Sequence, residues 1–370
     1  MSHRQYHITP LQFNSGCITF TEWISLYTLC LAPLIAHVVS GAPAASYLTK
    51  PKPRWHDQIC LWNPTSIIWR YAAIFDRRLR AKSWSRDDLA TTNAILWTRN
   101  GWDGSDGVVS EAVTSCVQRP DRTHGRILSA TTLKTLITTL QGIAAIYALV
   151  AERTGAGASN YDPLMGVDMV FSPLAVLGLL RLCAAAWLTE DFTYASPEST
   201  PDPPVAQDAA SPKPNARFRA PSSSWPSRCF RTFYLILCAG LWTLSLIYTV
   251  PVFHSLLFTT TSFLSSIFYL VLSTISFLTH AFYFFRGRTT TVLPCISHTW
   301  YKIYTLVIIS LMVVLVIMAS IETNRAPDGT YTSLRLGNDS MTQDLLPELA
   351  DICDFIKQHL DSGYVLVHCD

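Results

Sequence analysis

Four ionisable side chains of this 370-residue sequence lie inside or at the edges of long apolar stretches: Glu22, His37, Arg181 and His280. Charged groups are costly in hydrocarbon, so such residues are functional candidates by default. Arg181 lies in the stretch 169–188, where it could anchor a helix by reaching the interface or take part in a substrate pathway. Glu22 fits an interfacial position. His37 and His280 both fall near predicted cytosolic helix ends, where they could share a ligand or a proton or simply be solvated.

The usual catalytic and cofactor motifs are absent from the sequence. It contains no GxxxxGK[ST] phosphate loop, no GxGxxG after a strand, no HExxH zinc motif, no GxSxG nucleophile elbow and no CxxC pair. We therefore predict no catalytic residues, no cofactor-binding or metal-binding residues, and no nucleic-acid partner.

Several residues could be modified. Asn338 begins an N-D-S sequence, the only N-glycosylation acceptor pattern without a central proline. Cys229 lies between two arginines near the edge of an apolar stretch, which is a context for S-palmitoylation. Cys17 could form a disulfide bond with Cys353 or Cys369 if that side of the membrane is oxidising.

The elements that must position these residues are long apolar helices. Charged residues make up 15% of the chain and hydrophobic residues 49%, whereas soluble domains contain about 25% charged residues. This composition excludes a simple cytosolic enzyme. A bilayer core of about 30 Å needs roughly 20 apolar residues in a helix. The stretches that meet or approach this length are 20–39, 133–151, 169–188, 232–250, 262–285 and 303–321. We predict an all-α polytopic integral membrane protein with about six transmembrane helices.

The charges outside these stretches predict an orientation. Residues 40–132 contain 13 lysines and arginines against 8 acidic residues, and cationic loops stay in the cytosol. Residues 322–370 contain three basic and nine acidic residues, which fits the outer or lumenal face. We expect both termini on the outer side, with an outer N-terminal segment and the first helix in residues 1–39.

The remaining chain divides at a proline-rich segment. Residues 189–231 contain eight prolines, and we expect them to form a disordered cytosolic linker, because such a composition buries too little apolar surface to fold. This linker separates two three-helix halves, which comprise membrane helices in residues 133–188 and 232–321.

The basic cytosolic loop contains one helical pattern. It follows a turn at Asn63 and Pro64, and its apolar residues lie broadly on one side with arginines mostly opposite. One interpretation is an amphipathic helix over 67–82 that lies on the membrane and contacts anionic lipid head groups. The other is a solvated helix that leads into a small cytosolic subdomain.

The N-terminal part also resembles known proteins. The run FNSGCITFTEWISLYTLCLAPLIAHVVSG from Phe13 to Gly41, followed by PRWHDQICLWNPTSIIWRY from Pro53 to Tyr71, resembles the opening of uncharacterised multi-pass membrane proteins of filamentous fungi. The resemblance covers about the first 80 residues. It implies a fungal membrane protein, with no activity and no catalytic residues to carry over, and an accessory or export role in specialised metabolism is conceivable.

Three classes of function are compatible with these features. We favour transport or export of a small molecule, because three plus three crossings give the inverted topology of many transporters. The alternative is a receptor-like or scaffolding membrane protein, for which a seventh helix would be a pointer. A membrane-embedded enzyme is third, since no crossing contains paired His, Asp or Glu residues at helical spacing.

Overall fold

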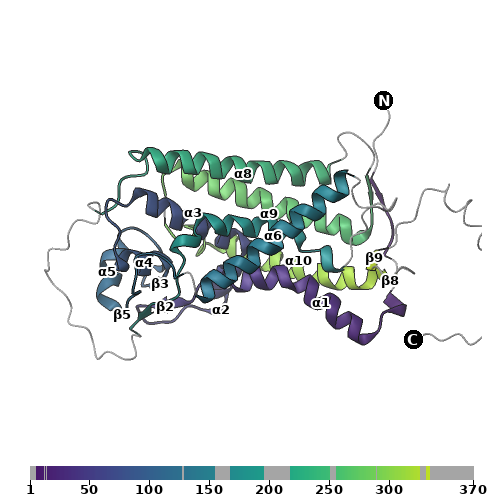
Figure 1. Cartoon of the computed structure of the whole chain (residues 1–370), viewed down its shortest axis with the longest axis horizontal. Coiled ribbons are helices and arrows are strands. Elements are labelled where there is room, and N and C mark those ends of the chain that lie inside the picture. The colour runs from purple at the N-terminus through teal and green to yellow at the C-terminus, as the bar shows by residue number, and fades with distance from the viewer. Residues whose placement is uncertain are drawn as a thin grey trace, which may run out of the picture. The chain divides into compact units, whose positions relative to one another are not determined.

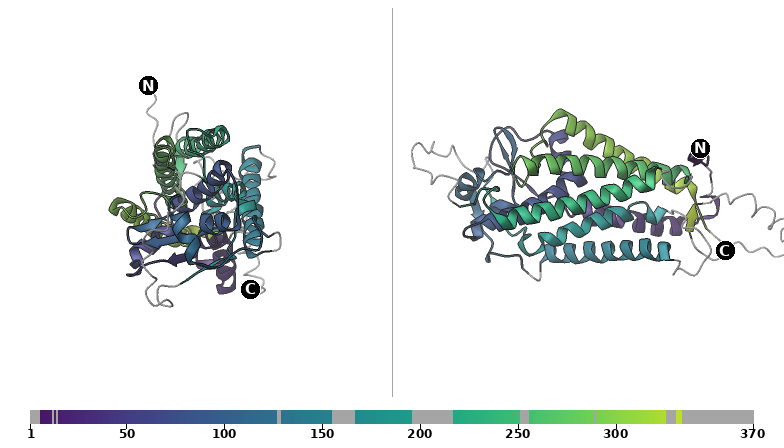
Figure 2. Two further views of the ribbon diagram at one scale, coloured as in Figure 1. Left: turned by 90° about the vertical axis from the view of Figure 1, so that its left-hand side faces the viewer. Right: turned by 90° about the horizontal axis from the view of Figure 1, so that it is seen from above.

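A computed structural model describes residues 6–11, 13, 15–126, 129–154, 167–195, 217–250, 256–288, 290–325 and 331–333. This part of the chain is mostly helical, and its long helices run side by side (Figures 1 and 2). The α-helices are α1 (Phe20–Leu34), α2 (Trp55–Gln58), α3 (Pro64–Arg80), α4 (Arg86–Asn93), α5 (Val108–Ser115), α6 (Ala130–Thr154), α7 (Ser172–Gly178), α8 (Trp225–Thr249), α9 (Thr260–Phe285) and α10 (Thr299–Glu322).

Shorter helices and strands complete the described elements. The π-helix η2 (Ile35–Val39) continues α1, and the 3₁₀ helices are η1 (Ser15–Cys17), η3 (Ile59–Trp62), η4 (Val167–Met169), η5 (Leu179–Cys183) and η6 (Ala185–Trp187). The strands are β1 (Tyr6–Ile8), β2 (Ala45–Tyr47), β3 (Ile95–Thr98), β4 (Gly101–Asp103), β5 (Cys116–Gln118), β6 (Thr193–Tyr194), β7 (Leu256–Phe258), β8 (Thr323–Arg325) and β9 (Tyr331–Ser333). The fold is therefore not purely helical, but every strand has four residues or fewer.

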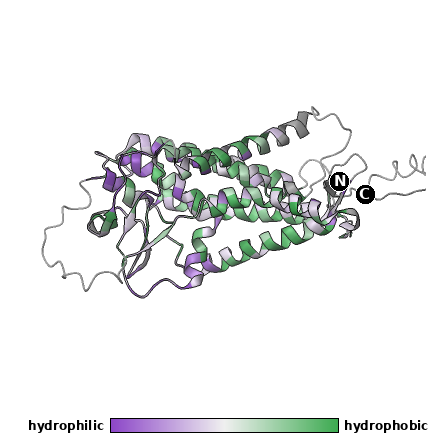
Figure 3. Cartoon of the chain, turned by 60° about the horizontal axis from the view of Figure 1, so that its bottom comes forward, coloured by the Kyte–Doolittle hydropathy of each residue, from purple (hydrophilic) through white to green (hydrophobic). Residues whose placement is uncertain are grey.

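Four helices of the described chain are long and apolar enough to cross a membrane: Phe20–Val39, α8, α9 and α10. Hydrophobic residues follow the long helices, whereas hydrophilic residues gather at one end (Figure 3). Large apolar side chains such as Ile236, Leu278 and Val313 are exposed, as expected of helix faces that contact lipid. The predicted membrane helices at 20–39, 232–250, 262–285 and 303–321 are thereby confirmed as apolar helices of sufficient length.

The predicted count of about six is not confirmed. The stretch 133–151 lies within α6, which is long enough to cross a bilayer but is not among the four apolar spans found in the described residues. The stretch 169–188 is divided into α7, η5 and η6, and its longest apolar helical part is only Ser172–Cys183.

Two glycines allow these two segments to pack closely. A Cβ at Gly142 of α6 would lie 2.5 Å from a Leu179 side-chain carbon, and one at Gly178 of α7 would lie 2.6 Å from the Thr138 methyl carbon. Both distances are far below van der Waals contact, so a larger residue fits only if its neighbours shift.

Helix α3 is held inside the bundle by polar contacts at its N-terminus. Asn63 caps the helix by accepting a hydrogen bond from the Thr65 amide at 2.9 Å. The Thr65 hydroxyl contacts the hydroxyls of Ser276 on α9 and Tyr304 on α10 at 2.8 and 2.9 Å. Ser66 contacts the Tyr301 hydroxyl at 2.6 Å. These contacts fix α3 against α9 and α10.

The C-terminal half of α3 is fixed by a buried charge network. Asp76, which is fully buried, accepts hydrogen bonds from Arg80 at 3.1 Å and from two nitrogens of Arg231 on α8, both at 2.8 Å. Asp106 pairs with Arg77 and Arg80 at 3.0 and 2.8 Å. Burial alone would raise the pKa of the Asp106 carboxyl, but these two arginines hold it below its ordinary value.

This network changes the interpretation of residues 67–82. The predicted helix is present, but Arg70, Arg77 and Arg80 are buried, with exposed fractions of 8, 0 and 1%. They bind protein carboxylates and carbonyls rather than forming an open basic face. These arginines are buried because α8, η5 and the elements after α3 pack against the face of α3 that carries them.

The hydrophilic end of the bundle includes a small folded part. The helix that leads into it is buried, so it is not the solvated helix of the second interpretation. Strands β2, β3 and β4 form one sheet in that order, with β2 parallel and β4 antiparallel to β3. Helices α4 and α5 lie at the same end of the bundle (Figure 1). Strand β5 pairs with β6, which links this part to the segment after η6.

Parts of the predicted linker 189–231 are ordered. Residues 193–194 form β6, Ala81 forms a β-bridge with Phe218, and α8 begins at Trp225 rather than at Thr232. The expectation of disorder is therefore wrong for 189–195 and 217–231, because these residues pack against α3, α4 and β5. Residues 196–216 lie outside the described chain.

Candidate functional site

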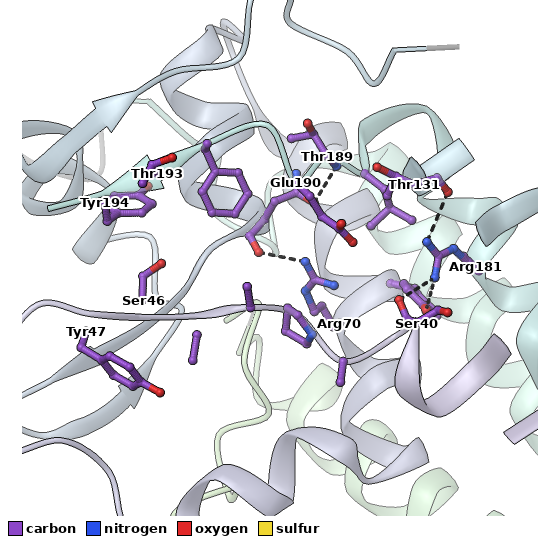
Figure 4. Close-up of a pocket in the computed structure, with 18 of the residues that line it drawn as sticks. Ser40, Ser46, Tyr47, Arg70, Thr131, Arg181, Thr189, Glu190, Thr193 and Tyr194 are labelled. Carbon is purple, nitrogen blue, oxygen red and sulfur yellow. Dashed lines mark hydrogen bonds between the residues drawn. The ribbon is translucent and has the colours of Figure 1, made fainter. Parts of the chain in front are cut away.

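A cavity of about 300 Å³ lies at the hydrophilic end of the bundle, where segments far apart in the sequence meet (Figure 4). Its walls come from residues 40–47 after η2, from α3, from the last residue of α4, from the start of α6, from η5 and from residues 188–195. Two guanidinium groups line it, Arg70 of α3 and Arg181 of η5. We take this cavity as the candidate functional site.

Arg181 is 2% exposed and is held by neutral groups of three other segments. Its Nε donates to the Thr135 hydroxyl at 2.9 Å, and its terminal nitrogens donate to the Ser40 carbonyl at 3.2 Å, the Tyr71 hydroxyl at 3.1 Å and the Thr131 carbonyl at 3.3 Å. The guanidinium carbon also lies 5.6 Å from the centre of the Tyr71 ring. The side chain is thus fixed by four hydrogen bonds that leave its charge unneutralised.

Arg70 is less completely satisfied. One terminal nitrogen donates to the Asn93 carbonyl at 2.8 Å, while the buried Nε has no hydrogen-bond partner in the described chain. Burial, together with the nearby Arg181, lowers the pKa of the Arg70 guanidinium to about 10. It therefore stays protonated at neutral pH and keeps a free donor.

Asn93 connects the cavity wall to neighbouring segments through its hydrogen bonds. Its side-chain amide donates to the Leu89 and Trp187 carbonyls at 2.9 and 2.7 Å and accepts a hydrogen bond from the Thr189 amide at 3.3 Å. The Asn93 carbonyl meanwhile accepts from Arg70. One residue at the end of α4 thus positions both Arg70 and the segment 188–195.

Among the described residues, one acidic side chain lines the cavity. Glu190 is half exposed and forms an ion pair with Lys134 of α6 at 2.7 Å. Its charge also favours the protonated form of Arg70, but no described carboxylate lies within ion-pair distance of Arg70 or Arg181. Two guanidiniums and Lys134 against one carboxylate leave the cavity with an excess of positive charge, which attracts anions.

The opposite part of the cavity is aromatic. Tyr47, Phe192 and Tyr194 line it, and Phe192 and Tyr194 meet edge to face with ring centres 5.9 Å apart. The Tyr194 hydroxyl is buried and has no hydrogen-bond partner in the described chain. Burial raises the pKa of this hydroxyl, so it is a neutral donor. The cavity therefore combines a cationic side with an aromatic side that carries neutral hydroxyls.

Irregular helices border the cationic side. Residues 35–39 form a π-helix that ends at Ser40, and Arg181 lies in the 3₁₀ helix that continues α7. Single π-turns within helices occur often at functional sites, and at membrane depth irregular backbone is tolerated where it is covered by protein or lines a cavity. Of the residues singled out from sequence, Arg181 is the one that this cavity contains.

The two histidines have different surroundings and lie outside this cavity. His37 in η2 is 1% exposed, packs beside Gly178, and forms no hydrogen bond through its ring nitrogens within the described chain. His280 of α9 is buried and contacts the Tyr234 hydroxyl and the Thr65 carbonyl, both at 3.2 Å. Their contacts do not form a joint site, and the expectation that they are solvated is wrong, because the bundle encloses both.

The remaining predicted residues lie elsewhere. Glu22 lies in the first turn of α1 and forms an ion pair with Arg325 at 2.9 Å, which agrees with a position at a helix end. Cys229 is exposed in the first turns of α8, and its lipidation stays a prediction. Asn338 and the tail partners proposed for Cys17 lie outside the described residues. The described chain contains no group of three or more potential metal ligands.

Sequence reasoning missed Arg70 as a site residue. It assigned this side chain to the polar face of the helix, although Arg70 stands between Trp69 and Tyr71 in a run that is apolar on both sides. This local setting does not reveal its burial, because arginine is usually exposed and its partner, the Asn93 carbonyl, lies 23 residues away.

Comparisons with known proteins give no relative from which a role could be transferred. No family model matches the chain, and neither a search of curated proteins nor one of solved structures found a match. The resemblance of residues 13–41 and 53–71 to fungal multi-pass membrane proteins stays a prediction.

Proposed function

We propose that this chain is a multi-pass membrane protein that transports or exports a small molecule, and that the Arg70–Arg181 cavity is where this molecule binds. The observation that carries the proposal is a buried cationic side chain, Arg181, that lines a cavity at the junction of two irregular helices. Binding sites of many transporters are formed by discontinuous helices of this kind.

Two further segments would complete the membrane part. Helix α6 has 25 residues, a length of about 37 Å at 1.5 Å per residue, and it exposes Leu136, Leu140 and Tyr147. The segment 167–187 is largely covered by protein. With the four apolar helices these segments would give six passages, with the cavity on the cytosolic side and both termini outside, as the loop charges predict.

Flux measurement tests this function directly. The purified chain would be reconstituted into vesicles loaded with a small-molecule extract of the producing cells, and the external medium followed by mass spectrometry. We expect at least one compound to leave faster than from vesicles without protein, and Arg181→Gln to abolish the difference. Arg99→Gln, an exposed arginine in the β3–β4 turn, is the matched control. If no compound leaves faster, the transport proposal is wrong.

A receptor-like or scaffolding role is the second candidate. The observation in its favour is that residues 86–118 form the folded elements α4, β3, β4, α5 and β5 rather than a plain connector. This part offers a structured surface to a partner. Ligand binding without any flux would favour this role over transport.

A further inference from the structure

We infer that the ligand of the Arg70–Arg181 cavity is a small organic anion, a carboxylate or a phosphate monoester, with an aromatic or similarly apolar body. Its acid oxygens would lie at the two guanidiniums and its body against Phe192 and Tyr194. This inference rests on the proposed function in taking the cavity to be the place where the handled molecule binds.

The first argument is a contrast between two kinds of buried arginine in the same protein. Arg77, Arg80 and Arg231 are buried, and each is paired with Asp76 or Asp106 at 2.8 to 3.1 Å. Arg70 and Arg181 are equally buried but, within the described chain, bind only neutral oxygens. A buried charge without a counter-ion is costly, so an anion in the cavity would stabilise both.

The second argument is the set of unused donors. The Nε of Arg70 and the hydroxyl of Tyr194 are buried without a hydrogen-bond partner among the described residues, and both residues line the cavity. Unsatisfied buried donors are uncommon in proteins and call for an explanation such as a bound ion or an ordered water. Both atoms are covered by protein, so an acid oxygen would reach them only after a small shift of the neighbouring side chains. A guanidinium donor suits an acid oxygen in particular, because charge-assisted hydrogen bonds are the stronger kind.

The third argument limits the size and shape of the ligand. A cavity of about 300 Å³ is at the small end of small-molecule sites. It is too small for a folded peptide or an acyl chain with its head group. Phe192 and Tyr194 provide aromatic surface beside the neutral hydroxyls of Ser46, Tyr47 and Thr193, which fits an uncharged body rather than a second acid group.

The carboxylate of Glu190 competes with an anionic ligand for the positive charge of the cavity. It is the only carboxylate that lines the cavity in the described chain, and it is held by Lys134 on the rim. An anionic ligand must bind in its field. Replacing Glu190 with glutamine removes one negative charge, so it should tighten anion binding, an effect opposite to that of most substitutions in a binding site.

Binding of defined probes to the full chain in phosphatidylcholine nanodiscs tests the inference. The probes are benzoate, phenyl phosphate and the neutral benzamide, measured by titration calorimetry. We expect benzoate or phenyl phosphate to bind and benzamide not to bind. Arg70→Gln should weaken anion binding at least tenfold, Glu190→Gln should strengthen it several-fold, and Arg99→Gln should leave it unchanged.

Several outcomes would overturn the inference. Equal affinities for benzamide and benzoate would overturn it. So would an anion affinity that is the same in the wild type, Arg70→Gln and Glu190→Gln. Glu190 is half exposed, so the second variant keeps the test valid even if the first one misfolds. Loss of benzoate binding in nanodiscs that contain phosphatidylserine would assign the site to a lipid head group instead.

The binding and flux measurements separate the two proposals. Anion binding without any flux supports this inference and contradicts transport. Flux of neutral compounds with no anion binding supports transport and contradicts this inference.

Discussion

Replacing Asp76 with asparagine should destabilise the protein more than any other single charge removal at the hydrophilic end. Asp76 is fully buried and joins α3 to α8 through Arg231, whose side chain is only 7% exposed, and through Ser227 at 2.5 Å. Asparagine has nearly the same shape but no charge, so Arg231 would be left buried without its counter-ion.

The magnitude follows from the partners that remain. Arg80 keeps its ion pair with Asp106 at 2.8 Å, so the loss falls mainly on Arg231. Breaking a buried ion pair by removing one partner costs about 3–5 kcal/mol. A loss of about 3 kcal/mol corresponds to more than a hundredfold change in the unfolding equilibrium, at about 1.4 kcal/mol per tenfold.

The assay is unfolding of the purified chain in nanodiscs, followed by tryptophan fluorescence. The matched control is Asp87→Asn. Asp87 forms an ion pair with Arg119, whose side chain is half exposed, so this substitution should lower the free energy of unfolding by no more than about 1 kcal/mol. Replacing both Asp76 and Arg231 with apolar residues of similar size should recover part of the loss. A loss below 1 kcal/mol for Asp76→Asn would refute the view that this network fixes α3 to α8.

Three further predictions concern packing, acid stability and orientation. Gly178→Ala should destabilise the protein by about 1–3 kcal/mol in the same unfolding assay, because the new Cβ would fall 2.6 Å from a methyl carbon of α6, whereas Gly240→Ala, with nothing within 4 Å, should not. Asp106 has a lowered pKa in the folded state. The stability that its ionised carboxylate contributes is therefore present above its ordinary pKa of about 3.9 and is lost as the pH falls through the folded-state pKa. Asp106→Asn should make the free energy of unfolding depend less on pH in this acidic range. If the C-terminal side is lumenal, Asn338→Gln should remove an endoglycosidase-sensitive mass, and an unglycosylated wild-type chain in a glycosylating host would argue against that orientation.

Composition predicted the apolar helices well because a long uncharged run has few alternatives to a helix in lipid. Residues 20–39 were predicted to the residue, and α9 differed by only two residues at its start. The stretch 169–188 was wrong as one regular helix. Its division into α7, η5 and η6 depends on close packing at Gly178 against α6 and η2, and no window of local hydropathy contains that information.

The prediction that the arginines of α3 form an open polar face was wrong for a related reason. Its pattern of arginines is the same for a helix on a membrane surface and for one enclosed by protein. The difference lies in Asp76 and Asp106, which supply counter-ions, and in Asn93, whose carbonyl receives Arg70. Asp76 lies four residues before Arg80 on the same helix, but Asp106 and Asn93 are 23 to 29 residues from the arginines that they bind, and Arg231 is 155 residues from Asp76. Helical periodicity could not reveal these distant partners.

The two groups of arginine also explain why the cavity is open. Where an aspartate is within reach, as for Arg77 and Arg80, the guanidinium is paired within the protein. Around Arg70 and Arg181 the neighbouring side chains supply hydroxyls and carbonyls but no counter-ion, and the chain leaves about 300 Å³ unfilled. Structural stability alone would favour an apolar residue over an unpaired buried guanidinium. The presence of two such groups beside unfilled space is therefore better explained by a ligand that binds there than by packing.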